Sequence, residues 1–206
     1  IMLTARHHAC ESTGSYVLEG VLAELLQNPI EGYKVFCVPF VDYDGVIRGD
    51  QGKRRAPHDH NVDYAYDKPA IYPEVAAIRK YADENKCHIS FDFHSPWHMW
   101  EVNDHVFIVQ NEKTDKLNRF GEILESCITE KSMKYFHKND YPFMHGWNMG
   151  KSLGFSRHMA RRPENEIACT LETTYFGLED NVVSQPKLIE LGHCFARAIK
   201  QYIETM

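Results

Sequence analysis

The sequence predicts an α/β fold: a mixed, mostly parallel central sheet with helices on both faces. Short apolar runs of β-strand type alternate along the chain with amphipathic segments of helix length. This alternation is typical of parallel strands that are joined by helical crossovers. The 206 residues and an apolar content of 43% fit one domain, residues 1–206, with a sizeable core. No internal repeat or linker divides the chain.

The first elements are two strands with a helix between them. Residues 1–6 predict the end of a strand that delivers two histidines to a loop, and residues 33–40 predict a second strand. The segment 15–26 predicts a helix because its apolar residues recur at steps of three and four. These residues are Val17, Leu18, Val21, Leu22, Leu25 and Leu26. Asp44 and Gly45 then predict a turn.

The middle of the chain begins with a polar loop, residues 49–61, which contains two glycines, a proline and three consecutive cations. A helix is expected to start near Tyr72, since proline at the next position is tolerated in a first turn. Two further strands are predicted at 88–93 and 106–110. Their apolar and aromatic residues are typical of buried strands.

The last part of the chain predicts two helices that flank a fifth strand. Residues 111–131 carry an apolar stripe at helical spacing, and residues 132–166 read mostly as loop. The run 167–173 predicts the strand. Ser184 is expected to cap a long final helix with apolar residues at steps of three and four. These residues are Leu188, Leu191, Phe195, Ile199 and Tyr202.

Composition excludes some classes of function. The formal charge of −6 argues against nucleic acid as a partner, because nucleic-acid binders normally present a basic face. No apolar run reaches the roughly 18 residues that a membrane span needs. The six cysteines form no C-x-x-C pair, which argues against a structural zinc site. The sequence opens at Ile1 inside a predicted strand, so we expect N-terminal strands of the domain to be missing.

A candidate metal site comes from residues that follow the predicted strands. His8 and Glu11 are three positions apart, and His94 ends a later strand. Two histidines and one carboxylate form a typical catalytic zinc set, which leaves a position for water. His7, four residues before Glu11, is an alternative to His8. Ligands of α/β sheets bind beyond the carboxyl ends of the strands, so we expect these residues to share one edge with Glu172.

Five stretches, in order, resemble the zinc carboxypeptidase (metallocarboxypeptidase) family. Each motif is weak alone, but their common order along residues 1–177 is a strong signal. They correspond to the family's first metal-ligand motif, an Asp-Gly turn after a strand, a substrate-binding segment, the third-ligand strand and the strand of the catalytic base. The stretches are residues 5–12 (ARHHACES), 39–45 (PFVDYDG), 59–61 (DHN), 91–95 (FDFHS) and 170–172 (TLE).

The resemblance assigns roles residue by residue. It implies that His8, Glu11 and His94 bind one Zn²⁺ per chain. It implies that Asp59 hydrogen-bonds to a ligand histidine and so fixes its tautomer and orientation, although Asp59 could instead cap its own loop. Glu172 would be the catalytic base, taking a proton from the zinc-bound water and passing it to the leaving amine. A buried salt bridge is the alternative for a carboxylate in this apolar strand.

The cationic loop is implied to stabilise the oxyanion, because an aimed guanidinium favours the developing negative charge. Arg55 is our first candidate and Arg54 the second; a solvated basic turn is the alternative. Asn61 would bind substrate, but the family's arginine after this asparagine is Val62 here. Valine cannot clamp a terminal carboxylate, so Arg54 or another cation would have to replace it. The family's tyrosine about 20 residues before the catalytic glutamate also has no clean counterpart.

The resemblance implies a zinc-dependent hydrolase that cleaves a peptide (amide) bond in a peptide or peptide-like substrate. A metallocarboxypeptidase that removes C-terminal residues fits it best. Two alternatives stay open. One is a zinc-dependent deacylase of N-acyl amino acids, which would not need the arginine missing at position 62. The other is a non-catalytic zinc-binding or peptide-binding module, which would need no base at Glu172.

Overall fold

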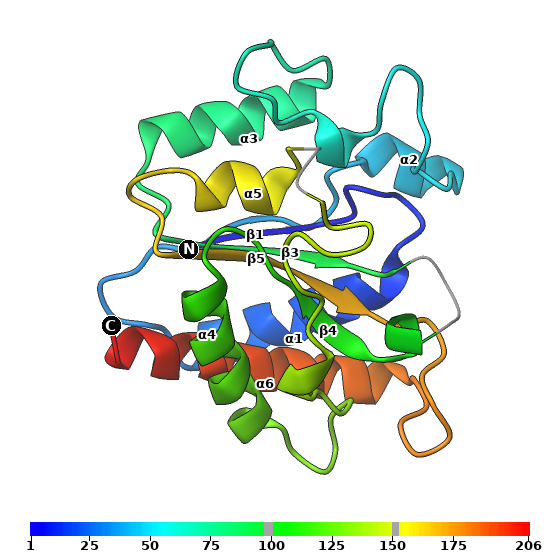
Figure 1. Ribbon diagram of the computed structural model, residues 1–206, viewed down its shortest axis with the longest axis vertical. Helices are drawn as coiled ribbons and strands as arrows, with labels where there is room; N and C mark the ends of the chain where they lie inside the picture. The colour runs from blue at the N-terminus through cyan, green and yellow to red at the C-terminus, as the bar shows by residue number, and fades with distance from the viewer. Residues whose placement is uncertain (97–100, 150–152) are drawn as a thin grey trace.

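One sheet organises the chain, and its strands lie in the order β2-β1-β3-β5-β4 (Figure 1). The computed structural model describes residues 1–96, 101–149 and 153–206. Within them, the strands are β1 (Met2–Ala5), β2 (Phe36–Val38), β3 (Ile89–His94), β4 (Val106–Val109) and β5 (Ile167–Thr173). All neighbouring pairs are parallel except β4 with β5, which is antiparallel. The predicted mixed, mostly parallel sheet is therefore confirmed.

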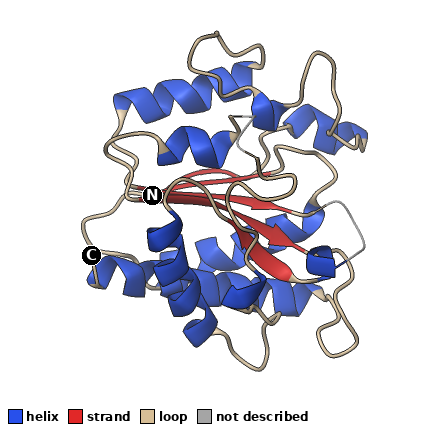
Figure 2. Cartoon of the chain, viewed as in Figure 1, coloured by secondary structure: helices blue, strands red, loops and turns tan. Residues whose placement is uncertain are grey.

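Helices cover both faces of this sheet (Figures 1 and 2). On one face lie α1 (Ser12–Gln27), α4 (Thr114–Cys127) and α6 (Gln185–Glu204), and on the other lie α3 (Pro73–Glu84) and α5 (Phe155–Ala160). A short helix, α2 (Tyr43–Arg48), follows β2. Single 3₁₀ turns are formed by η1 (His60–Val62), η2 (Glu101–Asp104) and η3 (His137–Asn139). No helix in the described parts of the chain is long and apolar enough to cross a membrane.

The strands send alternate side chains into two separate cores. Residues such as Leu3, Phe91 and Leu171 pack with α1, α4 and α6 in the larger cluster. Met2 and Ala168 face the opposite way and join Val75 and Phe155 in a smaller cluster under α3 and α5. Successive side chains of a strand point to opposite faces, so the sheet separates these clusters. The polar residues of β3 share the side of the smaller cluster.

Several predicted boundaries differ from the observed ones. The helix expected at 15–26 begins at Ser12, and the one expected at 111–131 is Thr114–Cys127. The expected turn at Asp44-Gly45 is instead the first turn of α2, because the Asp42 carboxylate caps it by accepting the Gly45 N–H. The stretch 132–166, expected to be mostly loop, contains α5 and η3. Ser184 does precede α6, but its side chain makes no capping hydrogen bond.

Candidate metal and active site

The candidate residues gather where β1, β3 and β5 end (Figure 1). His8 follows β1, and His94 is the last residue of β3. In the parallel register His94 lies directly beside Glu172 of β5. Aligned residues of parallel neighbours point to the same face, so the imidazole and the carboxylate share one side of the sheet. The expected common edge is therefore present.

Glu11 reaches this edge because α1 starts very close to β3. Gly14 in the first turn of α1 has no side chain, and a Cβ there would lie 2.9 Å from the Phe93 carbonyl group. Glycine thus permits an approach that any other residue would obstruct. Glu11, directly before the helix, donates its backbone N–H to the His8 carbonyl at 3.2 Å. The loop and the helix start together turn the Glu11 carboxylate toward His94.

His8, Glu11 and His94 form a compact cluster with ligand atoms within 4.8 Å of one another. Glu11 Oε1 lies 2.9 Å from His8 Nδ1, and Glu11 Oε2 lies 2.6 Å from His94 Nδ1. Oε2 is buried and makes no hydrogen bond of acceptable geometry, despite that short approach. The carboxylate thus faces one imidazole with each oxygen, and one of these buried oxygens lacks a hydrogen bond, which fits a shared cation. The donor set, two nitrogens and a carboxylate, is one that zinc prefers.

His7, the alternative to His8, contacts different partners. Its Nδ1 lies 2.9 Å from Asp92 Oδ1 and its Nε2 lies 2.7 Å from the Tyr64 hydroxyl. The imidazole is fully buried, whereas His8 remains partly accessible. His7, Asp92 and His94 also hold ligand atoms close together. Both nitrogens of His7 already have hydrogen-bond partners, so His8 suits the metal site at Glu11 better.

The charges of the cluster shift its titrating groups. Burial alone would raise the pKa of Glu11, but the adjacent His94 and His8 lower it well below its usual range. Burial would likewise lower the pKa of His94, but the Asp92 and Glu11 carboxylates raise it. Burial raises the pKa of Glu172 to about 7, against the opposing effect of His94. A carboxyl group with a pKa near 7 can both accept and return a proton at neutral pH.

Asp59 makes both contacts that the sequence left as alternatives. Its Oδ1 lies 3.5 Å from His8 Nε2, and the same atom accepts the Asn61 backbone N–H at 3.0 Å. It therefore caps η1 and faces the far nitrogen of a candidate ligand. Burial would raise the pKa of Asp59, but the hydrogen bonds from His8 and from the backbone lower it. An ionised Asp59 would favour the His8 tautomer with Nδ1 free for a metal.

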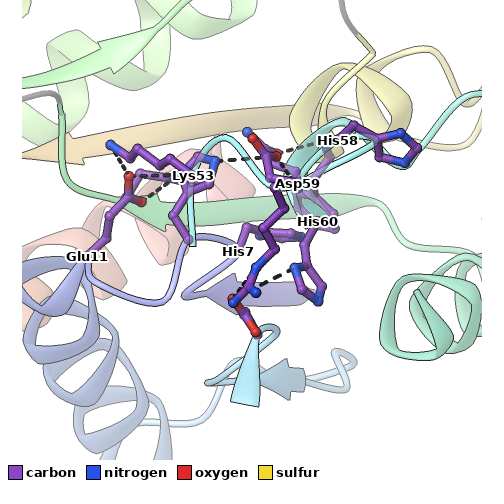
Figure 3. A network of polar contacts seen from close by, with 12 residues as sticks. His7, Glu11, Lys53, His58, Asp59 and His60 are labelled. Carbon is purple, nitrogen blue, oxygen red and sulfur yellow. Dashed lines mark hydrogen bonds and ion pairs between the residues drawn. The ribbon is translucent and has the colours of Figure 1, made fainter. Parts of the chain in front are cut away.

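Lys53 is a site residue to which the sequence gave no separate role. Its Nζ lies 2.6 Å from Glu11 Oε1 (Figure 3). The same group donates to the Ser95 carbonyl at 3.3 Å. Gly52 makes this possible: at φ 84° its Cα packs against the backbone of His8 and Ala9, and a Cβ would lie 2.2 Å from the Ala9 nitrogen. The cationic loop is thus docked directly on the first candidate ligand. The Gly-Lys pair before the two arginines was the only hint in the sequence.

The two arginines lie elsewhere on this loop. The Arg55 guanidinium binds the Asp42 carboxylate at 2.5 Å and Asp50 at 3.2 Å, near the start and end of α2. Arg54 is exposed and has a left-handed backbone, φ 56°. Arg55 is thus paired with carboxylates of the α2 segment and not with the Glu11 carboxylate. Their proposed roles remain predictions.

Asn61 contacts the start of α5. Its Oδ1 accepts the backbone N–H of Phe155 at 3.3 Å, so the side chain helps to fix the first turn of that helix. Val62 ends η1 and offers no charge. The role of Asn61 in substrate binding stays a prediction.

Asp92 is a second residue near the site that the sequence did not single out. Its Oδ2 lies 2.6 Å from His94 Nε2, the nitrogen opposite the one that faces Glu11. A signal was available, because residues two apart in a strand point to the same face. The pattern Ser90, Asp92, His94 on one face and Phe91, Phe93 on the other could have indicated it.

Comparison with known proteins finds carboxypeptidases among the proteins similar to this chain, although no family model matches it. A curated Plasmodium falciparum protein named "Putative zinc carboxypeptidase" is 30% identical over 116 residues, 52% of this chain and 7% of that protein. The metallo-carboxypeptidase from Burkholderia cenocepacia superposes with a TM-score of 0.74 and 17% identity, covering 99% of this chain and 56% of that one.

A metallo-carboxypeptidase from Pseudomonas aeruginosa, solved in complex with (2-guanidinoethylmercapto)succinic acid, has a TM-score of 0.72 and 18% identity over 99% of this chain and 57% of that one. The chain thus spans little more than half of these two structures and a small part of the curated relative. At such identities the solved structures establish the fold. The fold is that of the metallo-carboxypeptidases, and the curated match and the order of the five motifs are similar to the same family.

Proposed function

We propose that this chain carries the catalytic site of a zinc-dependent metallocarboxypeptidase, which hydrolyses peptide bonds at the C-terminus of its substrate. One observation supports it above others: the His8, Glu11 and His94 cluster has a carboxylate with a pKa near 7, Glu172, on the adjacent strand. A binding module would need the cluster but not the carboxylate.

The zinc would be held by Nδ1 of His8, the carboxylate of Glu11 and Nδ1 of His94. Zinc held there would polarise the scissile carbonyl and acidify a water. Glu172 would take a proton from the attacking water and deliver it to the leaving amine. Its burial supports this role, because a carboxyl group whose pKa is close to neutral exchanges protons in both directions with little cost. Asp59 would hold the His8 ring in its ligating orientation.

Lys53 is our candidate for stabilising the negative charge that develops on the carbonyl oxygen. Its ammonium group borders Glu11, whereas Arg55 is held by two carboxylates and would have to leave them. A positive charge aimed at an oxyanion lowers the barrier, by a few kcal/mol in well-formed sites. Arg55, the candidate from the sequence, is therefore the second choice.

Position 62 favours a second candidate, a deacylase of N-acyl amino acids. Valine there removes the cation expected to clamp a free C-terminus. Substrate recognition would then depend on another part of the molecule.

The test uses pairs of peptides that differ only in a free or amidated C-terminus, together with N-acyl amino acids, and reads products by mass spectrometry. The zinc-loaded chain is expected to remove single residues from the free-ended peptides. Glu172→Gln is expected to lose at least about 100-fold in kcat while still binding zinc. Lys53→Met should lower kcat and Arg55→Met should not.

Other outcomes lead to different conclusions. Hydrolysis of N-acyl amino acids alone would favour the deacylase, and no hydrolysis of any substrate by a zinc-loaded chain would contradict the proposal. The compound bound to the Pseudomonas protein, (2-guanidinoethylmercapto)succinic acid, is a useful second probe. Inhibition by it would support recognition of substrate carboxylates in spite of Val62.

A further inference from the structure

A continuous chain of buried polar side chains lies behind His94. Asp92 Oδ2 contacts His94 Nε2 at 2.6 Å, and Asp92 Oδ1 contacts His7 Nδ1 at 2.9 Å. His7 Nε2 in turn contacts the Tyr64 hydroxyl at 2.7 Å, and the Thr4 hydroxyl donates to Asp92 Oδ1 at 2.8 Å. None of these four supporting residues is accessible to solvent.

The directions of these hydrogen bonds follow from chemistry. An ionised carboxylate only accepts, so Asp92 must receive N–H groups from both imidazoles. His7 therefore carries its proton on Nδ1, and its Nε2 accepts the Tyr64 O–H. His94 likewise carries a proton on Nε2. The lone pair of a neutral His94 is consequently on Nδ1, the atom that faces Glu11 at 2.6 Å.

The position of His7 is fixed from several sides. It follows β1 directly, its ring stacks parallel to that of His94 with centroids 5.8 Å apart, and Phe155 of α5 packs 5.5 Å from it. Tyr64 is also held by Phe155. Because neither His7 nor Tyr64 can reorient toward solvent, the hydroxyl of Tyr64 fixes one orientation of His7, and His7 fixes the carboxylate of Asp92.

We propose that Tyr64, His7 and Asp92 act as a positioning relay that fixes the tautomer and ring orientation of His94 and so sets the affinity of the site for zinc. The inference rests on the proposed function, since it takes His94 as a zinc ligand. The relay goes beyond the proposed function because it assigns part of the metal affinity to a tyrosine and a histidine that are not themselves ligands. Partners of a ligating histidine typically contribute 10- to 100-fold to metal affinity.

The same atoms allow a competing interpretation, a second metal held by His7, Asp92 and His94. The hydrogen bonds argue against it. Each nitrogen of His7, both oxygens of Asp92 and His94 Nε2 already have a partner within this group or with Tyr64 and Thr4. A second metal would have to break several of these buried bonds.

The experiment measures zinc affinity of the full chain by competition with a chromophoric chelator. Tyr64→Phe keeps the buried ring and removes only the hydroxyl, and it should weaken zinc binding about fivefold to tenfold. Asp92→Asn should weaken it 10- to 100-fold. Tyr72→Phe is the matched control, because Tyr72 is only partly buried and its hydroxyl donates to the His58 carbonyl instead. Its zinc affinity should equal that of the wild type.

A second readout separates positioning from loss of fold. Nitrogen chemical shifts of ¹⁵N-labelled histidine, measured with zinc present, should show His94 protonated at Nε2 alone in the wild type and a loss of this single state in Asp92→Asn. Thermal melting of the metal-free variants reports their folding independently. Affinity and tautomer unchanged in Tyr64→Phe and Asp92→Asn would overturn the relay while leaving the zinc site intact.

Zinc stoichiometry distinguishes the remaining possibilities. Two zinc ions per wild-type chain, one of them lost in His7→Gln, would overturn the relay in favour of a second metal site. A wild-type chain that binds no zinc, or whose zinc affinity is unchanged by His8→Gln and by His94→Gln, would overturn the proposed function and the relay together.

Discussion

Lys53 and zinc are expected to compete for Glu11, and Lys53→Met tests this. The ammonium group lies 2.6 Å from Glu11 Oε1, with the lysine side chain 16% exposed and the glutamate 1%. At an effective dielectric constant of about 20, the Coulomb attraction is about 6 kcal/mol. Desolvation of two charged groups offsets most of it, and His8 and His94 still face Glu11 after the substitution. We therefore expect a loss of about 2 kcal/mol in the free energy of unfolding of the metal-free protein.

With zinc bound, the charge of Glu11 is neutralised by the metal and the loss should fall below about 0.5 kcal/mol. Because the thermodynamic cycle closes, the substitution should raise zinc affinity by the difference, about 10- to 30-fold. The assay is thermal melting with zinc and with chelator. The metal-free Tm should fall by about 4–8 °C for a chain of this length.

The matched control is Lys80→Met, since Lys80 is 75% exposed and forms a surface pair with Glu84 across one helical turn. Its Tm should change little in either condition, as expected for a surface pair. Equal destabilisation of Lys53→Met with and without zinc would refute the competition, and so would a metal-free Tm identical to that of the wild type.

Three further predictions concern the loop, acid stability and the metal. Gly52→Ala should lower the free energy of unfolding by about 1–3 kcal/mol and weaken zinc binding, because φ 84° and the 2.2 Å approach to the Ala9 nitrogen leave no room for a Cβ. Thermal melting and zinc titration measure the two effects. A variant with unchanged stability and zinc affinity would contradict this prediction. Burial lowers the pKa of His158 from 6.5 to about 4. As the pH drops, the histidine is therefore protonated in the unfolded chain before it is protonated in the folded one. The free energy of unfolding consequently falls between pH 6.5 and pH 4. Between pH 7.5 and 5 this loss in the free energy of unfolding amounts to about 2 kcal/mol. Thermal melts of His158→Gln at both pH values should lack this loss. The same loss in the variant would disprove the assignment of the pH dependence to His158. Zinc at about 100 times its dissociation constant should add about 3 kcal/mol to the free energy of unfolding, and His94→Gln should lose most of that gain.

The sheet could be predicted because its signals are local. The run IACTLET alternates small or apolar residues with Thr170 and Glu172 and formed β5, and the final apolar stripe formed α6. The boundaries were less predictable. Helix α1 begins three residues early at Ser12 because its packing through Gly14 on β3 is a tertiary contact. Helix α5 is only six residues long and leaves almost no periodic pattern.

The candidate ligands could be predicted because their chemistry is carried by residue type and short spacing. His8 and Glu11 are three positions apart, and His94 ends a strand; the common edge follows from parallel topology. The identity of the cation at the site could not be predicted. Lys53 and Arg55 are two residues apart on one loop, and only the placement of Gly52 against Ala9 and of Asp42 beside Arg55 separates them.

The sequence by itself determined the fold class and the resemblance to zinc carboxypeptidases, and it predicted the set of residues that we propose to bind zinc and to exchange a proton. These depend on local periodicity, on residue chemistry and on motif order. The tertiary structure alone decided that His7 lies behind the site, that Lys53 faces Glu11, and that Asp92 connects His94 to a buried tyrosine. Each of these depends on contacts between segments distant in sequence, such as residue 64 with residue 7, and no short pattern encodes such contacts.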